Sequence, residues 1–308
     1  MSSLISMSVI TSALELGVIY SLVALALFLS FSILNIADLS TDGCFTLGCA
    51  VGVQVALMGH PILALFASMA AGICSGYVMA FLQTKLGVES ILAGIIVNTG
   101  LYTINLAVMG FSSNVTLLKT DTIFSLTKGF LGKEYYKLIT AAVIVVIMCV
   151  LMVWFMGTRM GLSIRATGDN EDMVRASSIN PSMTITVGLC ISGALTALSG
   201  SLIGQYQKTC DINLGTGMVT IALASLIIGE TLIGKKTMVR RVFGVIFGSC
   251  LYRFLIALAL KFHIPAECLK LVSAVIVAIA IASPTIRKKI AFRKNKRNAI
   301  AAVKGGRN

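Results

Sequence analysis

Long apolar runs, separated by short polar stretches, extend over nearly the whole chain. A run of about 20 apolar residues can cross a bilayer as a helix. About nine runs approach that length, so the pattern predicts an all-α polytopic membrane protein. The predicted spans cover residues 12–34, 43–58, 62–83, 90–110, 138–156, 182–203, 216–233, 241–260 and 267–284. Residues 1–286 then form one transmembrane domain, followed by a basic tail at 287–308.

The second predicted span is short, and the polar stretch "NIADLSTDG" stands directly before it. We therefore expect a second helix that is broken within the membrane. Irregular backbone is tolerated at that depth only where protein or water satisfies its polar groups. The ends of interrupted helices also point their dipoles into a cavity, where a solute can meet them. The polar residues of this segment are Asn35, Asp38, Ser40, Thr41 and Asp42.

Composition agrees with a membrane protein: 57% of the 308 residues are hydrophobic, 12% are charged and the mean hydropathy is +0.94. The net charge of +13 indicates how the chain is oriented in the membrane, because cytoplasmic loops of membrane proteins are rich in lysine and arginine. The predicted cytoplasmic side holds 17 of the 25 lysines and arginines. They are Lys85, three residues in 157–183, four in the loop at 235–241 and nine in the tail. This places the N-terminus outside and the C-terminus in the cytoplasm. Basic residues are not interleaved with aromatic ones, which argues against nucleic-acid binding.

A compact charged insert interrupts the apolar pattern at residues 157–183, with three arginines and three acids. Gly168-Asp169 offers a helix cap, and Glu171 and Asp172 would occupy the first turn, where acids favour the macrodipole. Asn180-Pro181 should end this helix and begin the next. We expect a short helix of about two to three turns at the cytoplasmic surface. It either lies on the membrane or docks a cytoplasmic protein, and its acids favour docking, because interfacial helices carry basic polar faces.

The segment "GLSIRATGDNEDMVRASSINPSMT" resembles the coupling-helix region of permease subunits of ABC importers, in the branched-chain amino acid and tryptophan/tyrosine group. The stretches "GVIYSLVALALFLSFSILNIADLSTDGCFTLGCAVG" and "SLIIGETLIGKK" resemble the same permeases. The resemblance covers nearly the whole chain. It rests on the shared pattern at Gly161, Leu162, Arg165, Ala166, Gly168 and Asn170. Sugar permeases of ribose-type importers share this architecture.

This resemblance implies a homodimeric permease of the bacterial plasma membrane that imports an amino acid of the aromatic or branched-chain type, or alternatively a ribose-type sugar or a nucleoside. The segment at about 158–181 would dock on a cytoplasmic ABC ATPase. The coupling candidates are Gly161, Arg165, Gly168, Asp169, Asn170, Glu171 and Arg175. An extracytoplasmic binding protein or lipoprotein would deliver the solute, and membrane lipid would contact the basic tail. The segment with Asn35, Asp38, Ser40, Thr41 and Asp42 would line the pathway.

The sequence of this chain contains no recognisable ATP-hydrolysing site. "GETLIGKK" lacks the final Ser or Thr of a phosphate loop and follows a membrane helix instead of a buried strand. We therefore expect no cofactor or metal in this chain, which is not an enzyme, and ATP and Mg²⁺ in the partner ATPase. An ion-coupled secondary transporter is the alternative class, but it should show inverted repeats and a mid-membrane carboxylate. Glu230 is expected to pair with Lys235 or Arg240 near the inner loop.

Overall fold

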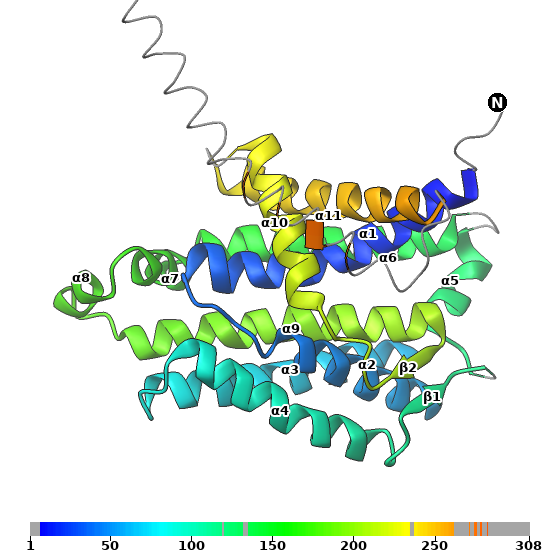
Figure 1. Ribbon diagram of the computed structural model, residues 1–308, viewed down its shortest axis with the longest axis horizontal. Coiled ribbons are helices and arrows are strands. Elements are labelled where there is room, and N and C mark those ends of the chain that lie inside the picture. The colour runs from blue at the N-terminus through cyan, green and yellow to red at the C-terminus, as the bar shows by residue number, and fades with distance from the viewer. Residues whose placement is uncertain are drawn as a thin grey trace, which may run out of the picture.

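The computed structural model describes residues 7–118, 120–131, 135–234 and 237–261, together with isolated positions at 271, 274, 275, 278 and 282. The described chain is a bundle of helices with one two-stranded ribbon (Figure 1). Its elements in chain order are α1 (Met7–Leu27), a π-helical segment η1 (Phe28–Ile33), α2 (Thr41–Leu57), α3 (Pro61–Thr84), α4 (Ser90–Val108), β1 (Asn114–Thr116), α5 (Ile123–Leu131), α6 (Tyr136–Met156), α7 (Arg159–Asp169), α8 (Glu171–Ala176), α9 (Pro181–Gln207), β2 (Thr209–Asp211), α10 (Met218–Ile233) and α11 (Met238–Lys261).

Six helices in the described residues are long and apolar enough to cross a membrane, and α2 and α10 are shorter apolar helices. The six candidates are α1 with η1, α3, α4, α6, α9 and α11. The predicted all-α polytopic architecture is therefore confirmed, and each of the first eight predicted spans coincides with one of these helices. The ninth predicted span, 267–284, and the tail at 287–308 lie outside the described residues except for isolated positions.

Two helices form the centre of the bundle. In α1 and α9, 78% and 83% of the most apolar stretch is buried, whereas in α6 the share is only 22%, so most of its surface is left for lipid. Small residues let α9 approach its neighbours closely. A Cβ at Gly193 would strike the backbone of Gly72 in α3, and one at Gly48 in α2 would strike Ala197. A Cβ at Gly200 of α9 would likewise strike the backbone of Phe45 in α2, so small residues fix α9 against both α2 and α3.

The predicted interruption near the second helix exists, but it precedes α2 and does not divide it. The chain leaves η1 at Ile33 and stays non-helical until α2 begins at Thr41. Asn35 adopts a left-handed conformation with φ +57°, which asparagine tolerates better than most residues. α2 then runs beside α9, and the thiol of Cys44 lies 3.4 Å from the carbonyl oxygen of Gly193, near the middle of α9. The interruption therefore opens into the middle of the bundle.

The charged insert forms two helices, α7 and α8, and not the single helix expected from the sequence. Thr158 caps α7 by accepting a hydrogen bond from the backbone N–H of Gly161. Asn170 caps α8 and accepts from Met173 N, so the predicted cap at Gly168-Asp169 is wrong: those two residues form the last turn of α7. The boundary predicted at Asn180-Pro181 is confirmed, because Asn180 caps α9 and Pro181 begins it.

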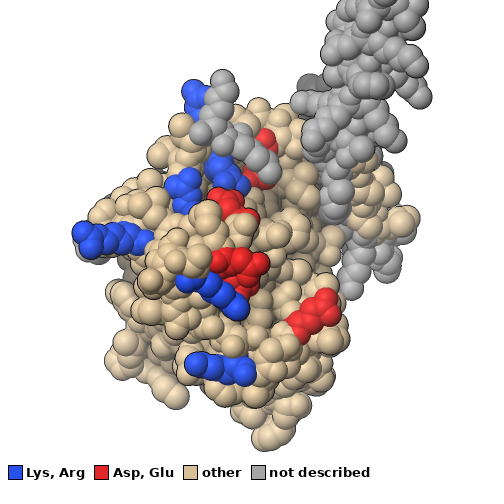
Figure 2. All heavy atoms as spheres, turned by 90° about the vertical axis from the view of Figure 1, so that its left-hand side faces the viewer, with Lys and Arg blue, Asp and Glu red and all other residues tan. Residues whose placement is uncertain are grey.

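The two ends of the bundle differ in structure. α7 and α8 project from one end, and the ribbon of β1 and β2 lies at the opposite end (Figure 1). The ribbon is antiparallel and pairs Val115 with Cys210. Seen from the α7–α8 end, acidic and basic side chains intermingle on the surface (Figure 2). This end therefore presents a mixed-charge surface on short capped helices.

We expect close packing of α2 on α9 to tolerate no added side chain. Gly48→Ala places its methyl against the Ala197 backbone, which should cost about 1–3 kcal/mol of stability as overpacking. Gly100→Ala is the matched control, since a Cβ there meets nothing within 4 Å. Thermal unfolding of both variants in detergent checks this. Equal midpoints for the two variants would contradict the packing described here.

Candidate functional site

The interrupted segment is held by its own polar side chains. The Asp38 carboxylate accepts hydrogen bonds from the Ser40 backbone N–H at 2.9 Å and from the Ser40 hydroxyl at 2.6 Å. The Thr41 hydroxyl donates to the Asp38 carbonyl at 3.1 Å. All three side chains are buried, whereas Asn35 is exposed. Asp38, Ser40 and Thr41 thus form a compact turn that supplies the backbone partners an interrupted helix lacks.

Asp42 joins the start of α2 to the start of α10. One carboxylate oxygen accepts from the backbone N–H of Gly217 and the other from that of Val219, both at 2.9 Å. The first N–H groups of a helix have no partner within it, and each unsatisfied group costs several kcal/mol in the membrane. The Thr46 hydroxyl accepts a further bond from Gly215 N at 3.1 Å. The negative charge of Asp42 also lies at the positive end of the α10 dipole.

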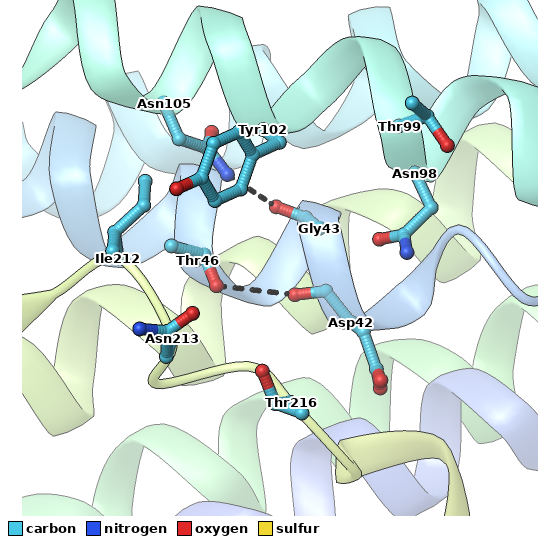
Figure 3. A pocket seen from close by; sticks show the side chains of 10 residues that line it. All are labelled: Asp42, Gly43, Thr46, Asn98, Thr99, Tyr102, Asn105, Ile212, Asn213 and Thr216. Carbon is cyan, nitrogen blue, oxygen red and sulfur yellow. Dashed lines mark hydrogen bonds between the residues drawn. The ribbon is translucent and has the colours of Figure 1, made fainter.

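A cavity of about 330 Å³ opens beside this junction. It is bounded by the first turns of α2, by α4 and by the turn before α10. Figure 3 shows the α4 side chains on one side of α2, with Asn213 and Thr216 on the other. Its lining residues are Asp42, Gly43, Thr46, Asn98, Thr99, Tyr102, Asn105, Ile212, Asn213 and Thr216. The cavity reaches the middle of the bundle, because Asn98 lies near the middle of α4 and Cys44 of α2 contacts Gly193 near the middle of α9. From there it extends toward the ribbon end, where its lining residues Ile212 and Asn213 directly follow β2.

Of the five predicted pathway residues, only Asp42 lines this cavity. The polar residues of α4, which form most of one wall of the cavity, were not among the residues predicted from the sequence. Asn98, Tyr102 and Asn105 recur at helical spacing on one face of an otherwise apolar span, and polar groups at membrane depth are expected to be functional. That pattern was the signal that could have found them. The residues of the turn, such as Asn213, carry no such signal, because their position depends on the tertiary fold.

The α7–α8 hairpin is seated directly on the interrupted segment. A Cβ at Gly168 would strike the carbonyl oxygen of Ile33 and approach the backbone of Leu34, so only glycine permits this backbone contact. The Thr167 hydroxyl bonds that of Thr184 in α9 at 2.8 Å. Gly161 packs in the same way against the end of α6. Three glycine- or threonine-mediated contacts therefore fix the hairpin to η1, α6 and α9.

The other coupling candidates lie on the outer surface of this hairpin. Arg165, Asp169 and Glu171 are exposed, and the Arg175 guanidinium pairs with Glu171 at 2.6 Å one turn away. Such an exposed pair contributes little to stability, about 0.3–0.5 kcal/mol. Asn170 contributes through its cap of α8. The charged groups are therefore available to a partner at small cost to the fold.

An ion pair joins the opposite end of α10 to α11, and both of its partners bond Ser32 of η1, just before the interrupted segment. Glu230 pairs with Arg241 at 2.8 Å and accepts a hydrogen bond from the Ser32 hydroxyl in η1 at 2.9 Å. The sequence predicted that Glu230 pairs with Arg240 or Lys235. The partner found is Arg241, the residue next to Arg240, and Lys235 lies outside the described residues. The Arg241 guanidinium also donates to Ser32 at 2.6 Å and lies over the Phe28 ring. α10 is thus bonded at its start to Asp42 and near its end to Ser32.

Comparison with known proteins identifies the family to which this chain belongs. The family described as "Branched-chain amino acid transport system / permease component" matches residues 9–282. The chain belongs to this permease family. A tyrosine transport system permease protein from Clostridioides difficile is 32% identical over 96% of this chain and 98% of its own length. The guanosine ABC transporter permease protein NupP from Bacillus subtilis is 26% identical over 90% and 82%. The ribose import permease RbsC from Escherichia coli K12 is 27% identical over 71% and 67%.

Family membership confirms the predicted class: the chain is the multi-pass transmembrane permease subunit of an ABC importer. A permease of such a system works with a separate ATPase and a substrate-binding protein, as the sequence resemblance implied.

Removing the Asp42 carboxylate should loosen the start of α10. In Asp42→Ala, two backbone N–H groups lose their acceptor, and each such loss costs about 1–3 kcal/mol. Hydrogen–deuterium exchange at Gly217 and Val219 should therefore accelerate about tenfold or more, because 1.4 kcal/mol corresponds to a factor of ten. Asp172→Ala, at an exposed position in α8, should leave this exchange unchanged. Unaltered exchange in Asp42→Ala would show that the junction is held by other contacts.

Proposed function

We propose that this permease subunit imports an amino acid of the aromatic or branched-chain type across the bacterial plasma membrane. The single observation that carries the proposal is the polar cavity that reaches the middle of the bundle between α2, α4 and the turn before α10. The relative of matching length that shares 32% identity is a tyrosine permease, which favours an aromatic amino acid. The guanosine and ribose permeases make a nucleoside or a sugar the second candidate cargo.

The subunit works with the N-terminus outside and the C-terminus in the cytoplasm. The bias of lysine and arginine supports this orientation, and it puts α7 and α8 on the cytoplasmic side. With 267–284 counted as the last span, the chain crosses the membrane nine times.

We further propose a homodimer, because the cavity opens at the protein surface and the exposed Thr99 and Tyr102 would otherwise meet lipid. A second copy would cover these groups and close the pathway, which the segment from Asn35 to Asp42 borders.

The α7–α8 hairpin is the coupling element in this proposal. The cytoplasmic ATPase, which binds ATP and Mg²⁺, contacts the exposed residues Arg165, Asp169, Glu171 and Arg175. The permease chain is non-catalytic and needs no cofactor of its own. Closure of the ATPase moves the hairpin as a body. The Gly168 contact with Ile33 and Leu34 passes that movement to the interrupted segment, and Asp42 passes it to α10 and the cavity wall.

Co-purification followed by reconstitution tests the proposal. The tagged chain, isolated in mild detergent, should retain a stoichiometric ABC ATPase. In liposomes supplied with ATP and the loaded binding protein, it should accumulate labelled L-tyrosine. Uptake of ribose or guanosine in preference to tyrosine would favour the second candidate. A homo-oligomer that holds no ATPase and transports without ATP would contradict the proposal.

The Gly168 contact should be needed for coupling but not for docking. Gly168→Ala pushes the hairpin away from Ile33, because its methyl would strike the backbone there. We expect normal ATPase association and an uptake per ATP hydrolysed that falls about tenfold. Gly157→Ala, also at this end of the bundle, is the control, since its Cβ would meet only Trp154 O at 3.3 Å and Val153 O at 3.8 Å. Uptake per ATP equal to the control would show that transmission uses another contact.

A further inference from the structure

We propose that the cavity beside Asp42 is a selective binding site, whose occupant is a single zwitterionic amino acid with an aromatic side chain. The inference rests on the proposed function and adds to it a substrate class read by the permease itself. A permease that serves only as a passage needs no built site, because its binding protein chooses the cargo. The cavity instead combines unused polar groups with an aromatic wall.

The polar groups of the cavity are available to a ligand. Asn105 is 1% exposed and donates its amide N–H to the Gly43 carbonyl at 3.1 Å, yet its amide oxygen has no partner among the described residues. Because that oxygen is enclosed by protein atoms, Asn105 holds α4 to the start of α2, and the ligand contacts fall to the more accessible polar side chains. The side chains of Asn98, Asn213 and Thr216 also have no hydrogen bond to another described residue. Amides and hydroxyls both donate and accept, so they can bind an ammonium and a carboxylate alike.

The charge of the cavity favours a cargo without net charge. Asp42 is the only acid or base among the ten lining residues, and both of its oxygens are occupied by backbone N–H groups of α10. A solute with a net charge would find no free opposite charge at a depth where an unpaired ion is costly. The two charges of a zwitterion compensate one another and need only dipoles around them. The neutral amides therefore favour a cargo without net charge.

The shape of the cavity indicates an aromatic side chain of limited size. The Tyr102 side chain is 52% exposed and forms part of the wall (Figure 3). Aromatic rings stack with one another in offset or edge-to-face geometry. A volume of about 330 Å³ is at the small end of the range for ligand sites, which is about 300–1,000 Å³. One amino acid fits this description better than a peptide or a disaccharide.

Direct binding of L-tyrosine to the permease–ATPase complex, without the binding protein, tests the inference. Saturation-transfer NMR detects weak ligands, and L-tyrosine should give a saturable signal. Tyr102→Leu should weaken binding about two- to tenfold, which is the contribution of an aromatic pair, and Tyr102→Phe should retain most of it. Tyr77→Leu is the matched control, because Tyr77 is 54% exposed on α3 and lies outside the cavity. Asn98→Ala should also weaken binding and provides a second variant if Tyr102→Leu does not fold.

Competition defines the substrate class. Phenylalanine should displace tyrosine, whereas tyramine, 4-hydroxyphenylpropionate, ribose and guanosine should not. No tyrosine signal from the wild-type complex, or equal losses in Tyr102→Leu and Tyr77→Leu, would overturn the inference. Equal displacement by tyramine would overturn the requirement for zero net charge, and displacement by guanosine or ribose would overturn the amino-acid class. Binding without ATP-dependent uptake would instead overturn the proposed function, so the two failures are distinguishable.

Discussion

The hydrogen bonds from the start of α10 to the Asp42 carboxylate are the constraint on which the rest of the site depends. Two helices begin in the middle of the bundle, where water is scarce and every free backbone N–H is costly. Asp42 occupies the first turn of α2 and satisfies two of the α10 groups at 2.9 Å. It is therefore a structural acid held between two helix starts. The cavity is the space that this junction leaves open between α2, α4 and the turn before α10.

Because the junction is bonded and not merely packed, movement of the interrupted segment must move α10 as well. η1 contacts the α7–α8 hairpin at Gly168 and bonds the end of α10 through Ser32 and Glu230. Asn35, at φ +57°, lies between these connections at residues 32–34 and the Asp42 junction, and can serve as a hinge. α10 crosses the long helices at a steep angle (Figure 1), so its displacement alters the cavity wall. Allosteric transmission needs such a contiguous element with two arrangements.

Hydropathy was sufficient to predict most of the fold, because burial in lipid imposes long apolar runs wherever a helix crosses. The helix boundary at Asn180-Pro181 was also predictable, since its capping chemistry is local. The division of the insert into α7 and α8 was not, because Gly168-Asp169 and Asn170 are both plausible caps, and the contact of Gly168 with Ile33 decides between them. The cavity required tertiary structure: its walls come from three separate segments, at 42–46, 98–105 and 212–216, which no local pattern joins.

Sided accessibility of the cavity is the most direct test of the central claim that the hairpin and the Asp42 junction switch this site between the two sides of the membrane. A cysteine placed at Asn98 would be treated with a membrane-impermeant thiol reagent, added from one side of proteoliposomes that contain the importer. Labelling would be located by mass spectrometry, without nucleotide and with a hydrolysis-deficient ATPase held in ATP. The account predicts that the reactive side changes between the two states. Labelling from the same side in both states, or protection in both, would contradict it.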